Sequence, residues 1–167
     1  MRKSLIILPA IAGLLVVGVA GPASAEDTTV TVEVTGGALT ITVPATLALA
    51  AVPASTTAQL VNAPLGTVEV SDLRGTAAGW SVTAASADVV GSELGGAISY
   101  ATDDATFTGA VAIVATDVPV LSTTAAAVQT ATATGANTGT WTPTIELTVP
   151  AGALAGSYSA TITHSVA

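Results

Sequence analysis

The chain has 167 residues, of which 50% are hydrophobic and 8% are charged, and it contains no cysteine. The missing thiol excludes disulfides, a Cys-ligated metal site, a cysteine nucleophile and a lipoprotein anchor. Eleven acidic residues stand against three basic ones, which excludes nucleic acids and anionic lipids as electrostatic partners, since both are bound through clustered Lys and Arg.

Residues 1–25 have the three parts of a secretory signal peptide. Arg2 and Lys3 supply positive charge, an apolar stretch runs from Leu5 to about Gly21, and small residues follow at Ala23-Ser24-Ala25. A proline and a glycine interrupt the apolar stretch, which falls just short of the roughly 18 to 20 residues that span a bilayer. Cleavage after Ala25 is therefore favoured over an uncleaved membrane anchor.

Residues 26–167 then form a single exported domain, expected to be secreted and free of the membrane. This domain keeps all eleven acids, but its one base is Arg74, so its formal charge is −10. We expect no covalent anchor, because no Leu-Pro-x-Thr-Gly sorting signal and no second apolar tail follow the last predicted strand.

Apolar residues in this domain alternate with Thr and Ser at a period of two, which is typical of half-buried strands. In residues 28–35 the valines Val30, Val32 and Val34 share one face. Gly36-Gly37 then predicts a turn into a second run at residues 39–43, and therefore a hairpin. Further strands are expected at residues 67–71, 80–85, 96–101, 111–115, 140–149 and 157–166.

Two stretches lack this alternation. The Ala-rich residues 45–61 are compatible with a short helix, and the Ala/Thr run at residues 122–136 predicts a long loop. Many strands separated by Gly and Pro, without a convincing amphipathic helix, predict an all-β fold. We expect an antiparallel β-sandwich of immunoglobulin-like or jelly-roll-like form.

Catalytic groups are scarce in the exported domain, which has one histidine and no lysine. His164 shares a strand face with Tyr158, Ile162 and Val166, and a lone histidine on such a face is more often packed or hydrogen-bonded than catalytic. We therefore expect no enzyme activity.

Five acids lie close together in sequence: Asp88, Glu93, Asp103, Asp104 and Asp117. Such carboxylates could bind calcium, but the Asp-x-Asp-x-Asp-Gly loop is absent, and adjacent acids on a strand point to opposite faces. A solvated turn at Asp103-Asp104 is favoured, and we expect no cofactor.

Trp80 and Trp141 each begin an alternating run after a Gly-containing turn. Side-chain alternation favours their burial at the end of a core. A partly open aromatic platform for a glycan is the alternative.

Two motif-bearing stretches lie near residues 68–85 and 139–166. The first reads Val68-Glu69-Val70-Ser71-Asp72-Leu73-Arg74-Gly75, followed by Gly79-Trp80-Ser81-Val82-Thr83-Ala84. The second contains Gly156-Ser157-Tyr158-Ser159-Ala160-Thr161-Ile162-Thr163-His164. The chain thereby resembles the WxL domain of Gram-positive surface proteins, in a divergent actinobacterial-type form. That family pairs an Asp-x-Arg-Gly turn with a Gly-Trp-x-(Leu/Val)-Thr-Ala strand and closes with Tyr-x-x-x-Leu-Thr-Trp-x-Leu, whose Trp is replaced here by His164.

The resemblance implies a β-sandwich held noncovalently on the bacterial cell wall through peptidoglycan or another wall glycan, often beside other surface proteins. The candidate wall-binding or motif residues are Asp72, Arg74, Trp80, Val82, Trp141, Tyr158 and His164. Two interpretations of Arg74 stay open. It either pairs with an acid of its own turn, which suits its planar guanidinium, or binds a carboxylate of a peptide stem.

A domain of charge −10 is repelled by anionic wall polymers. Wall attachment would then depend on hydrogen bonds and aromatic contacts, or on bridging divalent cations. The alternative function is a structural or adhesive subunit that assembles with copies of itself or with partners through exposed strand edges.

Overall fold

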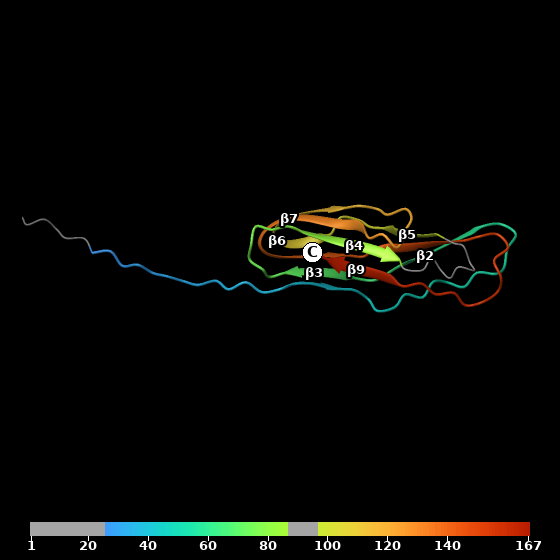
Figure 1. Cartoon of the computed structure of the whole chain (residues 1–167), viewed down its shortest axis with the longest axis horizontal. Coiled ribbons are helices and arrows are strands. Elements are labelled where there is room, and N and C mark those ends of the chain that lie inside the picture. Colours follow the sequence, from blue (N-terminus) through green and yellow to red (C-terminus); the bar gives the residue numbers. More distant parts are fainter. Residues whose placement is uncertain (1–25, 87–96) are drawn as a thin grey trace, which may run out of the picture. The chain divides into compact units, whose positions relative to one another are not determined.

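The structure is a computed structural model that describes residues 26–86 and 97–167 (Figure 1). The expected signal peptide lies outside the described residues. The chain divides into two units, Met1–Glu33 and Val34–Ala167. In the first unit the described residues, 26–33, are exposed and have no secondary structure. All the strands of the described residues lie in the second unit.

These strands form two antiparallel sheets, which confirms the predicted all-β, sandwich-like fold. The larger sheet has the order β1-β3-β7-β4-β9, with β6 also paired to β7, and the smaller has the order β2-β8-β5. No helix in the described residues is long and apolar enough to cross a membrane. The strands are β1 (Leu39–Thr42), β2 (Gln59–Pro64), β3 (Val68–Asp72), β4 (Trp80–Ser86), β5 (Ala97–Ala101), β6 (Thr106–Ala115), β7 (Ala126–Trp141), β8 (Thr144–Val149) and β9 (Ile162–Val166).

The long strand β7 organises the larger sheet. Its first half pairs with β4, its second half pairs with β3, and β6 follows it along the other side. Gly135 of β7 and Gly109 of β6 have φ values of 75° and 91°, which L side chains rarely adopt, and the β6–β7 register shifts at Gly109. A side chain on Gly139 would meet Trp80 and Ile113. The two halves of the β6–β7 pair therefore face each other across the core.

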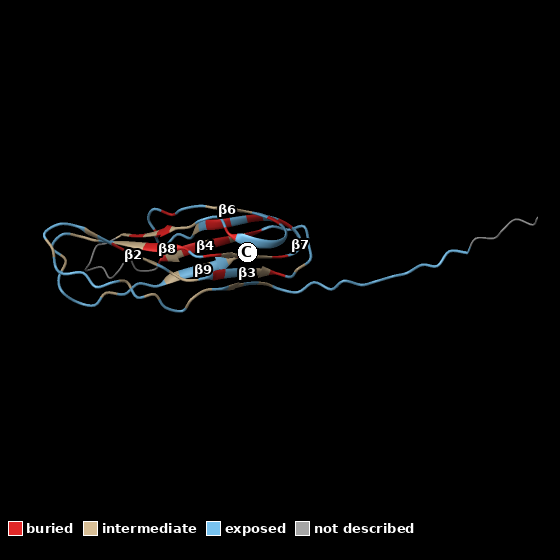
Figure 2. Cartoon of the chain, turned by 180° about the vertical axis from the view of Figure 1, so that it is seen from behind, coloured by how far each residue is buried: buried red, intermediate tan, exposed pale blue. Residues whose placement is uncertain are grey.

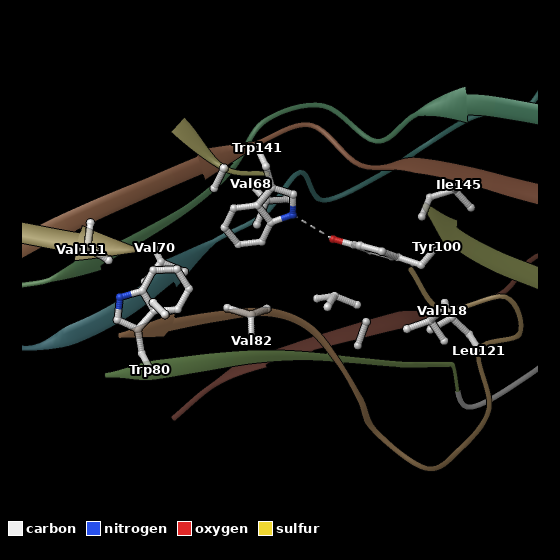
Figure 3. Packing of buried hydrophobic residues seen from close by; sticks show 14 of the residues in the cluster. Val68, Val70, Trp80, Val82, Tyr100, Val111, Val118, Leu121, Trp141 and Ile145 are labelled. Atoms are coloured by element: carbon white, nitrogen blue, oxygen red, sulfur yellow. Dashed lines mark hydrogen bonds between the residues drawn. The ribbon is translucent and has the colours of Figure 1, made fainter. Parts of the chain in front are cut away.

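Alternating valines fill this core. Val68 and Val70 come from β3 and Val82 comes from β4, and each is fully buried. Figure 3 shows them in the same part of the core as the rings of Trp80 and Trp141. Burial of one such valine stabilises the fold by about 1.5–3 kcal/mol. Figure 2 shows the buried residues gathered in the strands, whereas the connecting loops are mostly exposed.

The predicted hairpin of residues 28–35 with residues 39–43 is wrong. Residues 28–35 form no strand, and β1 pairs with β3 instead. Gly36-Gly37 is not a turn: the Gly37 N–H donates to the Leu73 carbonyl at 2.6 Å, and a Cβ on Gly36 would lie 2.5 Å from the Arg74 carbonyl oxygen. These glycines permit a close approach of two backbones.

Other boundaries also differ from the sequence predictions. Residues 45–61 contain no helix, and β2 begins at residue 59. The predicted loop at residues 122–136 is wrong, because most of it belongs to β7, where Ala and Thr alternate between core and solvent. The predicted strand at residues 140–149 is interrupted at residues 142–143, β6 starts earlier than expected, and β9 begins at residue 162. Gly96, the first residue of another predicted strand, lies outside the described residues.

Candidate functional site

The Asp-x-Arg-Gly turn between β3 and β4 is closed by its own charged pair. Arg74 Nε donates to Asp72 Oδ1 at 2.9 Å, and a terminal guanidinium nitrogen donates to Asp72 Oδ2 at 2.9 Å. The same terminal nitrogen donates to the carbonyl of Gly79 at 3.0 Å. Arg74 therefore links the end of β3 to the start of β4, as its planar, two-pronged guanidinium allows.

The hydrogen bond from Arg74 is the largest influence on Asp72, and it holds the pKa of that buried carboxyl below its usual range. Burial opposes this shift, while Asn137 adds to it through its own hydrogen bond. The Asp72 carboxylate in turn raises the pKa of Arg74, mainly through the shared hydrogen bonds. Both groups are thereby stabilised in their charged forms.

Asn137 joins this turn to the first tryptophan. Trp80 Nε1 donates to Asn137 Oδ1 at 2.9 Å, and the Asn137 amide donates to the Gly135 carbonyl at 3.0 Å. Asn137 was not expected as a site residue, since it lies in a glycine-rich stretch between Gly135 and Gly139. An Asn among glycines carries no signal of burial.

The second tryptophan lies in a different part of the core (Figure 3). Trp141 Nε1 donates to the Tyr100 hydroxyl at 3.3 Å. Burial raises the pKa of Tyr100 to about 12. The rings of Tyr100 and His164 lie 5.6 Å apart at an interplanar angle of 58°, and burial lowers the pKa of His164. His164 Nε2 is buried and has no hydrogen-bond partner among the described residues.

A small polar cavity of about 320 Å³ lies beside Trp141 and will be called the threonine cavity. Two of its hydroxyls, Thr106 Oγ1 and Thr140 Oγ1, are hydrogen-bonded to each other at 2.8 Å. Its lining combines four threonines, two carboxylates and one indole. The lining residues are Thr67, Asp103, Asp104, Thr106, Thr140, Trp141 and Thr142.

The loop that carries the two acids of the threonine cavity is fixed from the core. The buried side chain of Gln129 donates to the Asp103 carbonyl at 2.8 Å and to the Thr102 hydroxyl at 3.0 Å. Asp104 Oδ1 accepts the backbone N–H of Ala115 at 3.3 Å. The Asp103 side chain has no such structural partner among the described residues, so its carboxylate is available to a ligand.

Calcium coordination would need oxygens gathered around one point. Within the described residues no three His, Asp or Glu side chains lie close enough together to hold a metal ion. Asp117 Oδ1 accepts a hydrogen bond from the Thr102 N–H at 2.8 Å. Asp88 and Glu93 lie outside the described residues.

A larger cavity of about 850 Å³ is bounded mainly by residues 43–55 and 150–162. The smaller sheet adds Ile98, Ile145 and Leu147 to its lining, and β9 adds His164. Apart from the titratable His164, its lining residues are uncharged at neutral pH. Tyr158 also lines it, and the Tyr158 hydroxyl donates a hydrogen bond to the Leu154 carbonyl at 2.7 Å. This cavity suits an apolar, uncharged group.

The sequence-predicted site residues do not form one surface. Trp80 and Trp141 are 2% and 5% exposed, and Val82 is fully buried. Asp72 and Arg74 are paired with each other, whereas Tyr158 and His164 line the larger cavity. The motif residues thus lie mainly in the core, and the threonine cavity was not anticipated as a unit.

The chain matches no protein-family model, no curated protein and no solved structure.

Proposed function

We propose that this protein is a secreted, noncatalytic surface protein that associates noncovalently with the bacterial cell wall by binding the glycan of peptidoglycan in the threonine cavity. The observation that carries the proposal is the lining of that cavity, which combines four threonines, Asp103, Asp104 and the largely buried Trp141. Hydroxyls and carboxylates hydrogen-bond to sugar hydroxyls, and the small exposed part of Trp141 adds an apolar contact.

The negative charge of the domain also favours a ligand that is bound by hydrogen bonds and apolar contacts and not by charge attraction. With a formal charge of −10 after Ala25, the domain gains nothing from the field of an anionic polymer. Salt screens this repulsion over about 10 Å at 0.1 M. Wall binding should therefore persist or increase as salt is raised.

The resemblance to WxL domains supports the same assignment, and we propose that the chain is a divergent member of that family. The Asp72–Arg74 pair and the Trp80–Asn137 hydrogen bond give the motif residues a clear structural role. Because these motif residues hold the turn and the core together, we assign ligand contact to the residues around Trp141 instead.

A pull-down with purified peptidoglycan tests the proposal. Thr142→Val removes one exposed cavity hydroxyl at nearly constant volume, and loss of one hydrogen bond of about 1 kcal/mol weakens binding about fivefold. Thr130→Val is the matched control, because Thr130 is exposed on β7 outside the cavity. Asp103→Asn tests the carboxylate in the same assay.

Equal retention of all three variants would contradict the site, and no retention of the unaltered chain would contradict the function. Release of bound protein by moderate salt would contradict the neutral mode of attachment. Folding of each variant is checked beforehand by thermal unfolding.

A further inference from the structure

The segment of residues 28–35 has the sequence pattern of a strand, but it pairs with no strand in the described part of the chain. Val30, Val32 and Val34 alternate with threonines and one glutamate, and these valines are 88%, 87% and 87% exposed. Three valines on one face of an extended segment are typical of a half-buried strand. The backbone of this segment makes no hydrogen bond among the described residues.

Strand β6 offers an open edge to such a segment. Within residues 26–86 and 97–167, β6 pairs with β7 and with no other strand. Residues 106–115 contain no charge and no proline, although natural edge strands usually carry such features to prevent pairing with other chains. The bulge at Gly109 interrupts one end of this edge, so the regular part is residues 110–115.

The direction of the β6 backbone groups follows from two hydrogen bonds. The Thr116 N–H donates to the Val128 carbonyl of β7 at 2.9 Å, whereas the Ala115 N–H donates to Asp104 at 3.3 Å. Because successive residues of a strand point their N–H groups to opposite sides, those of Val111 and Ile113 point away from β7. These groups lie along the open edge, and Asp104 occupies its end.

Both faces of β6 beside this edge are apolar. Ala110, Ala112 and Val114 are exposed on one face, and Val111 and Ile113 lie on the other. An added strand in either orientation would therefore place its valines beside apolar side chains.

We propose that residues 28–35 of one copy of this chain pair, as an added strand, with the open edge of β6 in a second copy. A second copy fits better than the same copy, because the contacts of Gly36 and Gly37 with Leu73 and Arg74 hold the start of the fold beside β3. Strands β3 and β7 lie between that point and β6. To reach β6 of its own copy, the segment would have to cross these strands, which are about 4.8 Å apart, and several of its residues would then be unable to pair.

Pairing of one segment with a different surface of the next copy is head-to-tail, and such contacts produce open chains unless a ring closes. The proposal is independent of wall binding by the threonine cavity. Because each copy carries a formal charge of −10 after Ala25, screening by salt should strengthen the association.

Sedimentation of the chain that starts at Glu26, over a range of protein and salt concentrations, tests the proposal. We expect species larger than a monomer that increase with protein concentration and with salt. A chain that starts at Thr35 keeps every described strand and should stay monomeric. A synthetic peptide of residues 26–35 should bind to this shortened chain, and the peptide with both Thr31→Pro and Val32→Pro should bind at least about tenfold more weakly, since one of these two N–H groups faces the partner in either register and proline lacks it.

A matched pair of variants locates the receiving edge. Ala112→Lys places a charge on β6, and Thr132→Lys places the same charge on its exposed cross-strand neighbour in β7, one strand away from the open edge of β6. We expect the first to abolish assembly and the second to preserve it. A monomeric chain under all conditions, oligomers that persist without residues 26–34, or equal effects of the two lysines would each overturn the proposal.

Discussion

The indole nitrogen of Trp80 donates a 2.9 Å hydrogen bond to the side-chain oxygen of Asn137, in the buried region where β4 faces the second half of β7. Asn137→Ala would leave that N–H without its partner, and we expect the free energy of unfolding to fall by about 2 kcal/mol. Denaturant unfolding measures the loss. Asn62→Ala, at an exposed position of β2, is the control and should change the free energy little. Equal losses would refute the role of Asn137.

The Asp72–Arg74 pair should make the fold sensitive to acid. Because Arg74 lowers the pKa of Asp72 below 3.8 in the folded chain, the pair stabilises the fold above pH 3.8 and loses this effect as the pH falls through the lowered pKa. Asp72→Asn should therefore be less stable than the unaltered chain at neutral pH, and the difference should shrink below pH 3.8. Thermal unfolding between pH 2 and pH 7 checks this; a constant difference would contradict it.

Tyr100 should make the fold sensitive to alkali. Its pKa is raised from 10.0 to about 12 by burial, so the neutral hydroxyl stabilises the fold below pH 10, and this contribution disappears as the pH rises towards 12. Tyr100→Phe removes the titrating group together with the acceptor of the Trp141 N–H, at a cost of about 1–2 kcal/mol at neutral pH. Stability measured from pH 8 to pH 12 should fall less steeply in this variant.

His164 should add a second dependence on acid at milder pH. Burial lowers its pKa below 6.5, so the neutral ring is favoured in the fold. Its contribution is complete above pH 6.5 and is lost as the pH falls through the lowered pKa. His164→Phe keeps a ring beside Tyr100 and removes the unpartnered Nε2. This variant should lose less stability between pH 7 and pH 5, and an unchanged pH profile would contradict the effect of burial.

The period-two alternation predicted the β-fold because it reports which side chains face a core, as at Val68 and Val70 in β3. It failed at residues 28–35, where the same alternation has no core to face. It also failed at residues 122–136, since Ala and Thr differ too little in hydropathy to reveal the buried side of β7. Whether an alternating segment forms a strand was therefore decided by the strands available to pair with it, which the local sequence does not reveal.

The candidate site was less predictable than the fold. The Asp72–Arg74 pair follows from the spacing of an acid and the one base of the domain, and the structure contains it. The threonine cavity combines residues from three separate parts of the chain, which include Thr67, Asp103 and Thr140. No local pattern connects these positions, because β7 brings them together only after its pairing with β3 and β6.

The position of β7 near the end of the chain has a consequence for the order of folding. β3, β4 and β6 all pair with β7, yet all three precede it in sequence. As the polypeptide emerges from its amino terminus, these strands have no common partner until residues 126–141 appear. Contacts over such long sequence separations also form slowly. Under the secretion that we propose, the chain would therefore stay extended during most of its export and would acquire its sheet afterwards.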